Sequence, residues 1–388
     1  MFRIRQVPPS LLLMILAALA FLASPALRAA EGSPTCRVGF ATPYHVVDSQ
    51  ITRDAVRTAD GVFTLLAGTG YPVGRPGVGV LVKASAIGPE WMNVYGGEFD
   101  HGFTGIAELA DGTLVASGYA FDSIYSTDQR LWIIKLDSNG GILWEKTFGL
   151  PNEQTGAYAM TRTTDGGFIV ASLRFRFQSP VATPMTWVLK LDADGNVEWD
   201  RTFSGGVAHA ILETADGSYL LSGGQPIPGS LYSRVWALKI DRRGRAIWER
   251  VYDRQIYVLL ESGLAEAPGG YLISGKEFLQ KIGPNGDLLW IRDFPGLTFN
   301  TLAVLADGRI AAGGTDVATN NEHAYVTVMS PEGDKLIWAN SELLSPSGFT
   351  KIIPLQSSRT AGLIFAGWAP ADAQGLSFDL LVGSLWEY

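Results

Sequence analysis

Cysteine, long apolar runs and positive charge are what this chain has least of. Cys36 is its single cysteine, so no disulfide can form within the chain. After residue 30 no segment is apolar enough to cross a membrane, which predicts a soluble mature protein. The chain has 30 lysines and arginines against 38 aspartates and glutamates, a net charge of −8. Such a surface repels phosphate backbones, so we expect no nucleic-acid partner.

Recognisable catalytic and metal-binding motifs are also absent. The sequence Gly-x-Ser-x-Gly does not occur, and no Ser-His-Asp set can be inferred. The four histidines lack the spacing of a helix-based metal site, and they would have to converge in the fold to bind a transition metal: His45, His101, His209 and His323. We therefore expect no metal and no cofactor.

The first thirty residues have the features of an export signal. Arg3 and Arg5 supply the positive start, residues 11–23 form a short apolar core, and small residues follow over 24–30. This core is too short for a membrane span and is typical of a cleaved signal peptide. We predict a signal peptide at 1–30, a periplasmic or secreted location, and a single domain at 31–388.

Glycine is abundant, and much of it lies in tight turns that repeat along the chain. Short apolar runs follow these turns seven times, at intervals of 51, 54, 51, 52, 39 and 53 residues. A period of this length in strand-forming sequence indicates a β-propeller. The turns are Asp60-Gly61, Asp111-Gly112, Asp165-Gly166, Asp216-Gly217, Pro268-Gly269, Asp307-Gly308 and, degenerately, Thr360-Ala361.

The repeating unit contains four strand-like segments. In the second unit they lie at 105–110, 113–117, 131–136 and 142–148, with tight turns between the first pair and the second pair. This pattern predicts an all-β, seven-bladed β-propeller of four-stranded antiparallel blades. The seventh unit stops after its third strand. We expect residues 37–41 to supply the missing strand and close the ring, which removes exposed sheet edges.

Tryptophan and lysine recur at fixed positions in these units. A lysine or methionine precedes a tryptophan by nine residues in five units, and by eight in the first. Such aromatics form either a platform for sugars or peptides or the packing between blades, and we favour packing. The lysines are expected to extend their charged ends into water.

The succession of an Asp-Gly turn, an apolar strand, Trp-x-x-Lys, Asp-x-x-Gly and Trp-x-x-x-Phe-Gly resembles repeats of bacterial secreted propeller proteins. Trp132 to Gly149 show the second part of this succession in full. More distantly, the pattern is similar to the repeats of pyrroloquinoline-quinone-type propellers, and the resemblance covers about residues 36 to 388. It implies the fold. The quinone enzymes are normally eight-bladed, with a disulfide between adjacent cysteines and a calcium site. One cysteine and seven units depart from that pattern, so we do not transfer the quinone, and a redox activity is the least favoured function.

Polar residues occupy one position of the predicted innermost strands. Seven residues before each turn stand Arg53, Thr104, Tyr158, His209, Glu261, Asn300 and Ile353. We expect the six polar ones to surround the channel mouth on the face that carries the long loops. This ring is either a ligand-binding site or a solvated channel mouth.

A second ring lies three residues before the first four turns, at Arg57, Glu108, Arg162 and Glu213. The alternating charges predict structural ion pairs between neighbouring blades. A catalytic pair of Glu108 and Glu213 is the alternative, although neighbouring arginines would lower the pKa of both carboxyls and make them poor proton donors.

These observations favour a secreted, non-catalytic binding or scaffold propeller. It would act as a monomer and present its loop-rich face to a polysaccharide, peptide or protein partner. The alternative is a polysaccharide lyase or hydrolase with its site at the channel mouth. His209 or Tyr158 would then act as acid or base, Arg53 would hold a substrate carboxylate, and Glu261 would be its partner.

Overall fold

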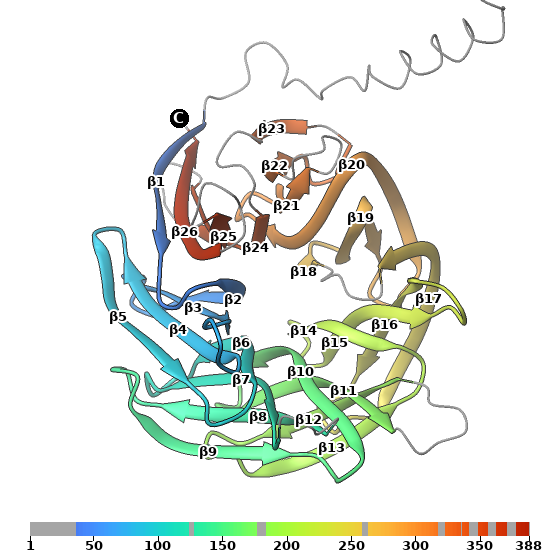
Figure 1. Cartoon of the computed structure of the whole chain (residues 1–388). Coiled ribbons are helices and arrows are strands. Elements are labelled where there is room, and N and C mark those ends of the chain that lie inside the picture. The colour runs from blue at the N-terminus through green and yellow to red at the C-terminus, as the bar shows by residue number, and fades with distance from the viewer. Residues whose placement is uncertain are drawn as a thin grey trace, which may run out of the picture.

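The computed structural model describes residues 36–123, 128–176, 184–257, 263–316, 323–334, 336–340, 348–355, 362–370 and 378–387. Within these ranges the regular structure is entirely β, and the sheets stand around a central opening as the blades of a propeller do (Figure 1). The signal peptide expected at 1–30 lies outside the described residues. No helix in the described part of the chain is long and apolar enough to cross a membrane.

Four blades follow one another along the chain, each with four antiparallel strands. The first blade contains β2 (Gln50–Arg57), β3 (Thr64–Gly70), β4 (Val78–Ser85) and β5 (Gly88–Tyr95). The second contains β6 (His101–Glu108), β7 (Leu114–Phe121), β8 (Gln129–Leu136) and β9 (Ile142–Phe148). The third contains β10 (Glu153–Arg162), β11 (Phe168–Arg176), β12 (Met185–Leu191) and β13 (Val197–Phe203). The fourth contains β14 (Val207–Glu213), β15 (Tyr219–Pro226), β16 (Tyr232–Ile240) and β17 (Ala246–Tyr257).

A fifth four-stranded blade, here called the closing blade, joins the two ends of the described chain. It contains β1 (Cys36–Tyr44), β26 (Phe378–Glu387), β25 (Gly362–Pro370) and β24 (Gly348–Leu355). β1 pairs antiparallel with β26 from Cys36 opposite Glu387 to Tyr44 opposite Leu380. The N-terminal strand thus completes this blade, as the segment 37–41 led us to expect. Figure 1 shows β1 lying beside β26, next to β2 of the first blade.

The prediction of seven four-stranded blades is wrong. The remaining strands form one six-stranded sheet: β18 (Leu264–Ala267), β19 (Gly270–Ile282), β20 (Leu288–Val304), β21 (Ile310–Asp316), β22 (His323–Met329) and β23 (Leu336–Asn340). The structure therefore has five four-stranded blades and this larger sheet.

The fifth and sixth repeats merge through one continuous strand, β20, and the second and third strands of the fifth repeat form a single strand, β19, because the loop between them is missing. β19 continues through a bulge between Lys276 and Phe278, where Glu277 takes a φ of 61°. β20 runs for 17 residues and pairs with β19 along one part and with β21 along the other. The two halves of the sheet pack on a shared apolar cluster that includes Leu272, Phe299 and Ala312.

Tryptophans pack between neighbouring sheets, in agreement with the interpretation of the repeat. Trp132 lies in one buried cluster with Leu65 and Leu81 of the first blade. On the fourth strands, the indole N–H reaches the second turn of the next unit: Trp91 donates to the carbonyl of Ser138 at 3.2 Å, Trp199 to Arg242 at 3.0 Å and Trp248 to Pro284 at 2.9 Å. A Cβ at Gly195 would stand 2.5 Å from the ring of Trp144, so this turn must be glycine for steric as well as conformational reasons.

Three of the five recurrent lysines, Lys135, Lys190 and Lys239, are buried, contrary to the expectation that their charged ends reach water. Each of these three pairs with the aspartate of the Asp-Gly turn in its own blade, at 3.6 Å for Lys135 with Asp111, 2.9 Å for Lys190 with Asp165 and 2.6 Å for Lys239 with Asp216. Lys190 is only 1% exposed. The sixth repeat has Met329 in place of the lysine, and there Asp307 pairs with Arg309 instead, at 2.7 Å. The Asp-Gly turn thus supplies an anion for a buried cation as well as a favourable backbone conformation.

Acid should weaken the fold through these turn aspartates. Burial opposes the ionisation of Asp216, but hydrogen bonds from Lys239 and Thr214 outweigh it, so the pKa of this carboxyl is lowered. The folded state therefore holds fewer protons than the unfolded chain in acid. The stabilisation is complete above the unfolded pKa of about 4 and is lost as the pH falls below it.

We expect Asp216→Asn to flatten the fall in the urea midpoint between pH 5 and pH 2.5. Asp194→Asn is the control, because the side chain of Asp194 makes no hydrogen bond or ion pair within the described ranges. Parallel pH profiles for all three proteins would contradict this prediction.

Gln280 in β19 offers a separate test of packing. It is 0% exposed, and neither Nε2 nor Oε1 has a hydrogen-bond partner among the described residues. The corresponding positions in other blades are occupied by Ile134, Leu189 and Leu238. Since an unsatisfied buried amide costs about 1–3 kcal/mol, Gln280→Leu should raise the free energy of unfolding by an amount in that range, measured by urea denaturation.

Gln225→Leu is the matched control, because its amide donates to the carbonyl of Gly205 at 3.2 Å and no stabilisation is expected from removing it. A lower urea midpoint for Gln280→Leu than for the parent protein would refute the packing argument.

Candidate functional site

A β-bulge interrupts the innermost strand at the same place in six repeats. In each case the Cα pairing register with the neighbouring strand skips one residue: Arg53, Thr104, Tyr158, His209, Asn300 and Thr350. A bulge changes the direction of its side chain relative to the regular alternation of the strand. The polar positions found in the sequence are therefore bulge positions.

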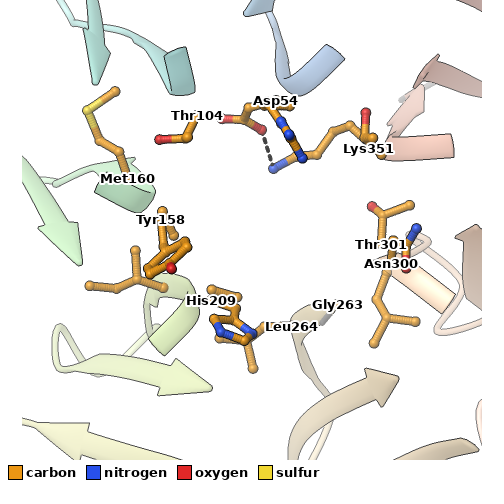
Figure 2. A pocket seen from close by; sticks show the side chains of 16 residues that line it. Asp54, Thr104, Tyr158, Met160, His209, Gly263, Leu264, Asn300, Thr301 and Lys351 are labelled. Atoms are coloured by element: carbon orange, nitrogen blue, oxygen red, sulfur yellow. Dashed lines mark ion pairs between the residues drawn. The ribbon is translucent and has the colours of Figure 1, made fainter. Parts of the chain in front are cut away.

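Six bulge side chains, from the four consecutive blades, the six-stranded sheet and the closing blade, line one cavity of about 120 Å³, the mouth cavity. Five of them are the sequence-predicted residues Arg53, Thr104, Tyr158, His209 and Asn300. Glu261, the sixth predicted residue, lies outside the described residues. Figure 2 shows Thr104, Tyr158, His209 and Asn300 placed around the opening.

In the closing blade the bulge residue is Thr350, not Ile353. The bulge lies between Phe349 and Lys351, whereas Ile353 pairs regularly with Ile364 and packs against an apolar cluster. The last turn lacks the glycine that the other turns share. Counting seven residues back from Thr360-Ala361 therefore gave Ile353, which is three residues C-terminal to the bulge residue Thr350.

One aromatic pair forms part of the wall. The rings of Tyr158 and His209 come from β10 and β14, with centroids 5.4 Å apart and planes at 59°. Tyr158 is 38% exposed, toward the cavity. Desolvation raises the pKa of its phenol, so the hydroxyl keeps its proton at neutral pH. Tyr158 is therefore suited to hydrogen bonding and stacking, and it is a weak acid.

Several mouth side chains also connect neighbouring sheets. The Thr104 hydroxyl donates to the carbonyl of Ala157 at 2.9 Å, and the backbone N–H of Ile352 donates to the hydroxyl of Thr301 at 3.0 Å. Oδ1 of Asn300 is buried and has no hydrogen-bond partner among the described residues. Tyr158, which is 38% exposed, carries a hydroxyl that a ligand in the cavity can use.

An ion pair crosses the inner end of the mouth cavity. Lys351 Nζ of β24 lies 2.9 Å from an Asp54 carboxylate oxygen of β2 (Figure 2). The other carboxylate oxygen of Asp54 accepts the backbone N–H of Ile106 at 3.1 Å, so one side chain connects three sheets. The side chain of Asp54 is 12% exposed.

The sequence analysis did not identify Asp54 or Lys351 as site residues, although a signal was present. Each directly follows a bulge residue, at a position occupied elsewhere by Gly105, Ala159, Ala210 and Thr301. The other repeats have a small residue at this position, whereas the first and last repeats have opposite charges. Because these two repeats meet where the ring closes, the charges indicate an ion pair between them. The shifted alignment of the last repeat concealed it.

The predicted interblade ion pairs of Arg57, Glu108, Arg162 and Glu213 are not formed, since no ion pair joins these four residues, all of which the structure describes. The glutamates do connect blades, but they bind backbone. Glu213 accepts the N–H and the hydroxyl of Thr164 at 2.7 and 2.8 Å, and Glu108 accepts the N–H of Ala59 at 2.5 Å. Arg57 donates to Gly61 of its own turn at 2.9 Å. The unpaired N–H groups of a neighbouring tight turn attract the carboxylates because they need an acceptor.

Within the described ranges no group of three or more His, Cys, Asp and Glu side chains is arranged to hold a metal ion. The side chain of His323 is outside the described set, and His45, His101 and His209 do not contribute to such a group.

Comparison with known proteins shows the fold alone. No protein-family model and no curated protein matches the chain. Among solved structures, Sqt1 from Chaetomium thermophilum is similar with a TM-score of 0.52, 12% identity and 85% of each chain covered. The same protein bound to the N-terminus of a ribosomal protein gives a TM-score of 0.52 and 12% identity over 88% of this chain and 96% of that one. The Dos1 propeller gives a TM-score of 0.51 and 11% identity, with 87% and 77% covered. The chain thus has a β-propeller fold.

The ion pair at the inner end of the mouth cavity should stabilise the ring. Asp54→Asn leaves Lys351 without its carboxylate and weakens the acceptor of the Ile106 N–H. A hydrogen bond to a charged group contributes about 1.5–3 kcal/mol, so we expect a loss in unfolding free energy of about 2 kcal/mol by urea denaturation.

Asp122→Asn is the control, because Asp122 is 49% exposed in its pair with Arg130, and we expect a change below about 0.5 kcal/mol. An equal effect of both substitutions would show that the Asp54–Lys351 pair is no more important than a surface pair.

Proposed function

We propose that this chain is a non-catalytic binding propeller that presents its loop-bearing face to a peptide segment of a protein partner, with the mouth cavity as the central anchor point. The observation that carries the proposal is the convergence of six bulge side chains on one cavity. Bulges placed alike in six strands direct polar side chains to a common point. A cavity with several converging polar groups is the usual form of a ligand site.

The surroundings of the cavity support a macromolecular partner. Large apolar side chains are exposed in connections on the same face as the mouth: Tyr71 at 44%, Val73 at 82%, Leu150 at 56% and Leu231 at 79%. A rigid scaffold that carries such loops is the common arrangement of a binding surface. Sqt1, a neighbour in fold, has been solved with the N-terminus of a ribosomal protein bound. That precedent supports a peptide partner in preference to a polysaccharide.

The location belongs to the same proposal. We infer export to the periplasm or the cell exterior from residues 1–30, so the partner would be an exported or surface protein.

An enzymatic alternative has one observation in its favour. Arg53, Tyr158 and His209, the residues that a polysaccharide lyase or hydrolase would use, line the same cavity. The pKa of Tyr158 argues against an enzyme. Burial raises this pKa, and no neighbouring cation lowers it. A tyrosine base in a lyase needs a pKa near the working pH, so the chemistry is unfavourable here.

A thermal-shift screen with peptide and oligosaccharide libraries tests the proposal on the mature protein. A ligand at 100 times its Kd stabilises the folded state by about 2.7 kcal/mol, enough for a clear rise in Tm. We expect selected peptides to give this rise, and His209→Ala and Arg53→Ala to abolish it. Arg250→Ala, on the exposed outer strand β17, should leave the shift unchanged.

No shift with any peptide, or a shift indifferent to His209 and Arg53, would overturn the proposal. Cleavage of an acidic oligosaccharide that is lost in Tyr158→Phe would replace it with the enzymatic alternative.

A further inference from the structure

The connection between β3 and β4, residues 71–77, is held in place from both sides although it lies at the surface. It is here called the display loop. Near its start the backbone N–H of Val73 donates to the carboxylate of Asp48 at 2.7 Å. At its end the backbone N–H of Gly77 donates to the carboxylate of Asp100 at 2.6 Å. The loop is thus tied to the connection before β2 and to the connection before β6.

The segment that carries Asp48 is fixed in turn by a buried side chain. Gln50 is 0% exposed, and its side-chain oxygen accepts the N–H groups of Val46 and Val47 at 3.2 Å each. The conformation of the display loop is therefore set by the strands beneath it. A loop that is already ordered loses little conformational entropy when it binds a partner.

The display loop exposes two large side chains near its tip. Val73 is 82% exposed and Tyr71 is 44% exposed, and only one residue separates them in the sequence. A single exposed apolar side chain is ordinary on a protein surface, but two on one ordered loop form a joint apolar surface. An aromatic residue held rigidly beside an aliphatic one is typical of the anchor residues of a binding interface.

The display loop adjoins the mouth cavity. The side chains of Tyr71 and Tyr119 are hydrogen-bonded to each other, and the positive charge of Arg53 acts on the phenol of Tyr119. Arg53 is also one of the bulge side chains that line the mouth. A peptide anchored in the mouth cavity can therefore extend onto the display loop.

The charges beside the display loop favour a basic segment. Asp48, Asp100 and Arg75 are all exposed, and within the described ranges none of them forms an ion pair. Two carboxylates against one guanidinium leave one net negative charge here, in a chain of net charge −8. Such a surface attracts cationic segments and repels anionic ones.

We propose that the display loop binds a large apolar side chain within a basic segment of the partner peptide. Tyr71 and Val73 contact the apolar side chain, while Asp48 and Asp100 attract lysines or arginines next to it. The inference rests on the proposed function in placing a peptide partner on this face, and it adds the chemical class of the residues that the partner presents.

Fluorescence anisotropy with four labelled mixtures of random decapeptides tests the proposal on the mature protein. The mixtures contain leucine and lysine, serine and lysine, leucine and glutamate, or serine and glutamate. We expect the leucine–lysine mixture to bind and each of the others to bind at least tenfold more weakly. Its affinity should also fall as salt is raised, because charge attraction contributes.

Matched variants make the result specific to the display loop. Val73→Ser should weaken binding of the leucine–lysine mixture at least fivefold. Val62→Ser is the control, because Val62 is 56% exposed in the same blade but follows the Asp60-Gly61 turn on the opposite face. Asp48→Asn keeps an acceptor for the N–H of Val73 and should reduce the salt dependence. Each variant is accepted only with a parental Tm.

Equal binding of the serine–lysine mixture, tighter binding of the leucine–glutamate mixture, or equal effects of Val73→Ser and Val62→Ser would overturn the proposal. Arg53→Ala separates it from the mouth anchor. Peptide shifts that need Arg53 but ignore Val73 would refute the display loop alone. Leucine–lysine binding that needs Val73 but ignores Arg53 would support the display loop and refute the mouth anchor.

Discussion

Closure of the ring is the constraint on which the rest of this molecule depends. Sheets in a propeller contact mainly their neighbours, so the first and last repeats must meet to remove the exposed edges. Three contacts accomplish this: the β1–β26 pairing, the Thr52 hydroxyl bonded to the carbonyl of Gly367, and the Asp54–Lys351 ion pair. The last of these lies in the channel. The same contact that closes the ring therefore also forms part of the wall of the mouth cavity.

The parts of this architecture that were predictable from sequence are those that repeat. The Asp-Gly turns and the tryptophan spacing indicated a propeller, and the polar position seven residues before each turn led to five side chains of the mouth cavity. What failed lies where a repeat is irregular. The number of blades was wrong because β19 and β20 each continue through what was expected to be two strands. The 39-residue interval showed that the fifth repeat is short, but it did not show that β19 continues through the positive φ of Glu277 or that β20 continues through the positive φ of Gly296.

The predicted exposure of the lysines and the predicted ion pairs of the glutamates were wrong for the same physical reason. In the folded protein each of these charged groups contacts a group from a turn, where the sequence had suggested water or an arginine. The recurrent lysines read as amphipathic strand residues, yet the aspartate of the turn lies close enough for Lys190 and Lys239 to be buried with it. Likewise Glu108 and Glu213 read as partners of arginines, yet the free N–H groups of a neighbouring turn are nearer. The alternating charges therefore indicated correctly that the glutamates contact a neighbouring blade. They did not identify the partner, which is the backbone N–H group that the fold places nearest to each carboxylate.

The bulges explain how one strand can serve both stability and binding. In a regular innermost strand, successive side chains would point alternately toward the two neighbouring sheets, and all of them would pack there. One extra residue releases a side chain toward the channel, while the residues on either side remain in register, as Phe103 and Gly105 do around Thr104. This release is incomplete, since Thr104 still bonds to Ala157 of the third blade. Substitution at the mouth consequently alters both the ligand surface and the contact between sheets. Tyr158 is the most informative position, because its hydroxyl makes no hydrogen bond within the described ranges, whereas the amide nitrogen of Asn300 donates to the carbonyl of Phe349 in the closing blade at 3.5 Å.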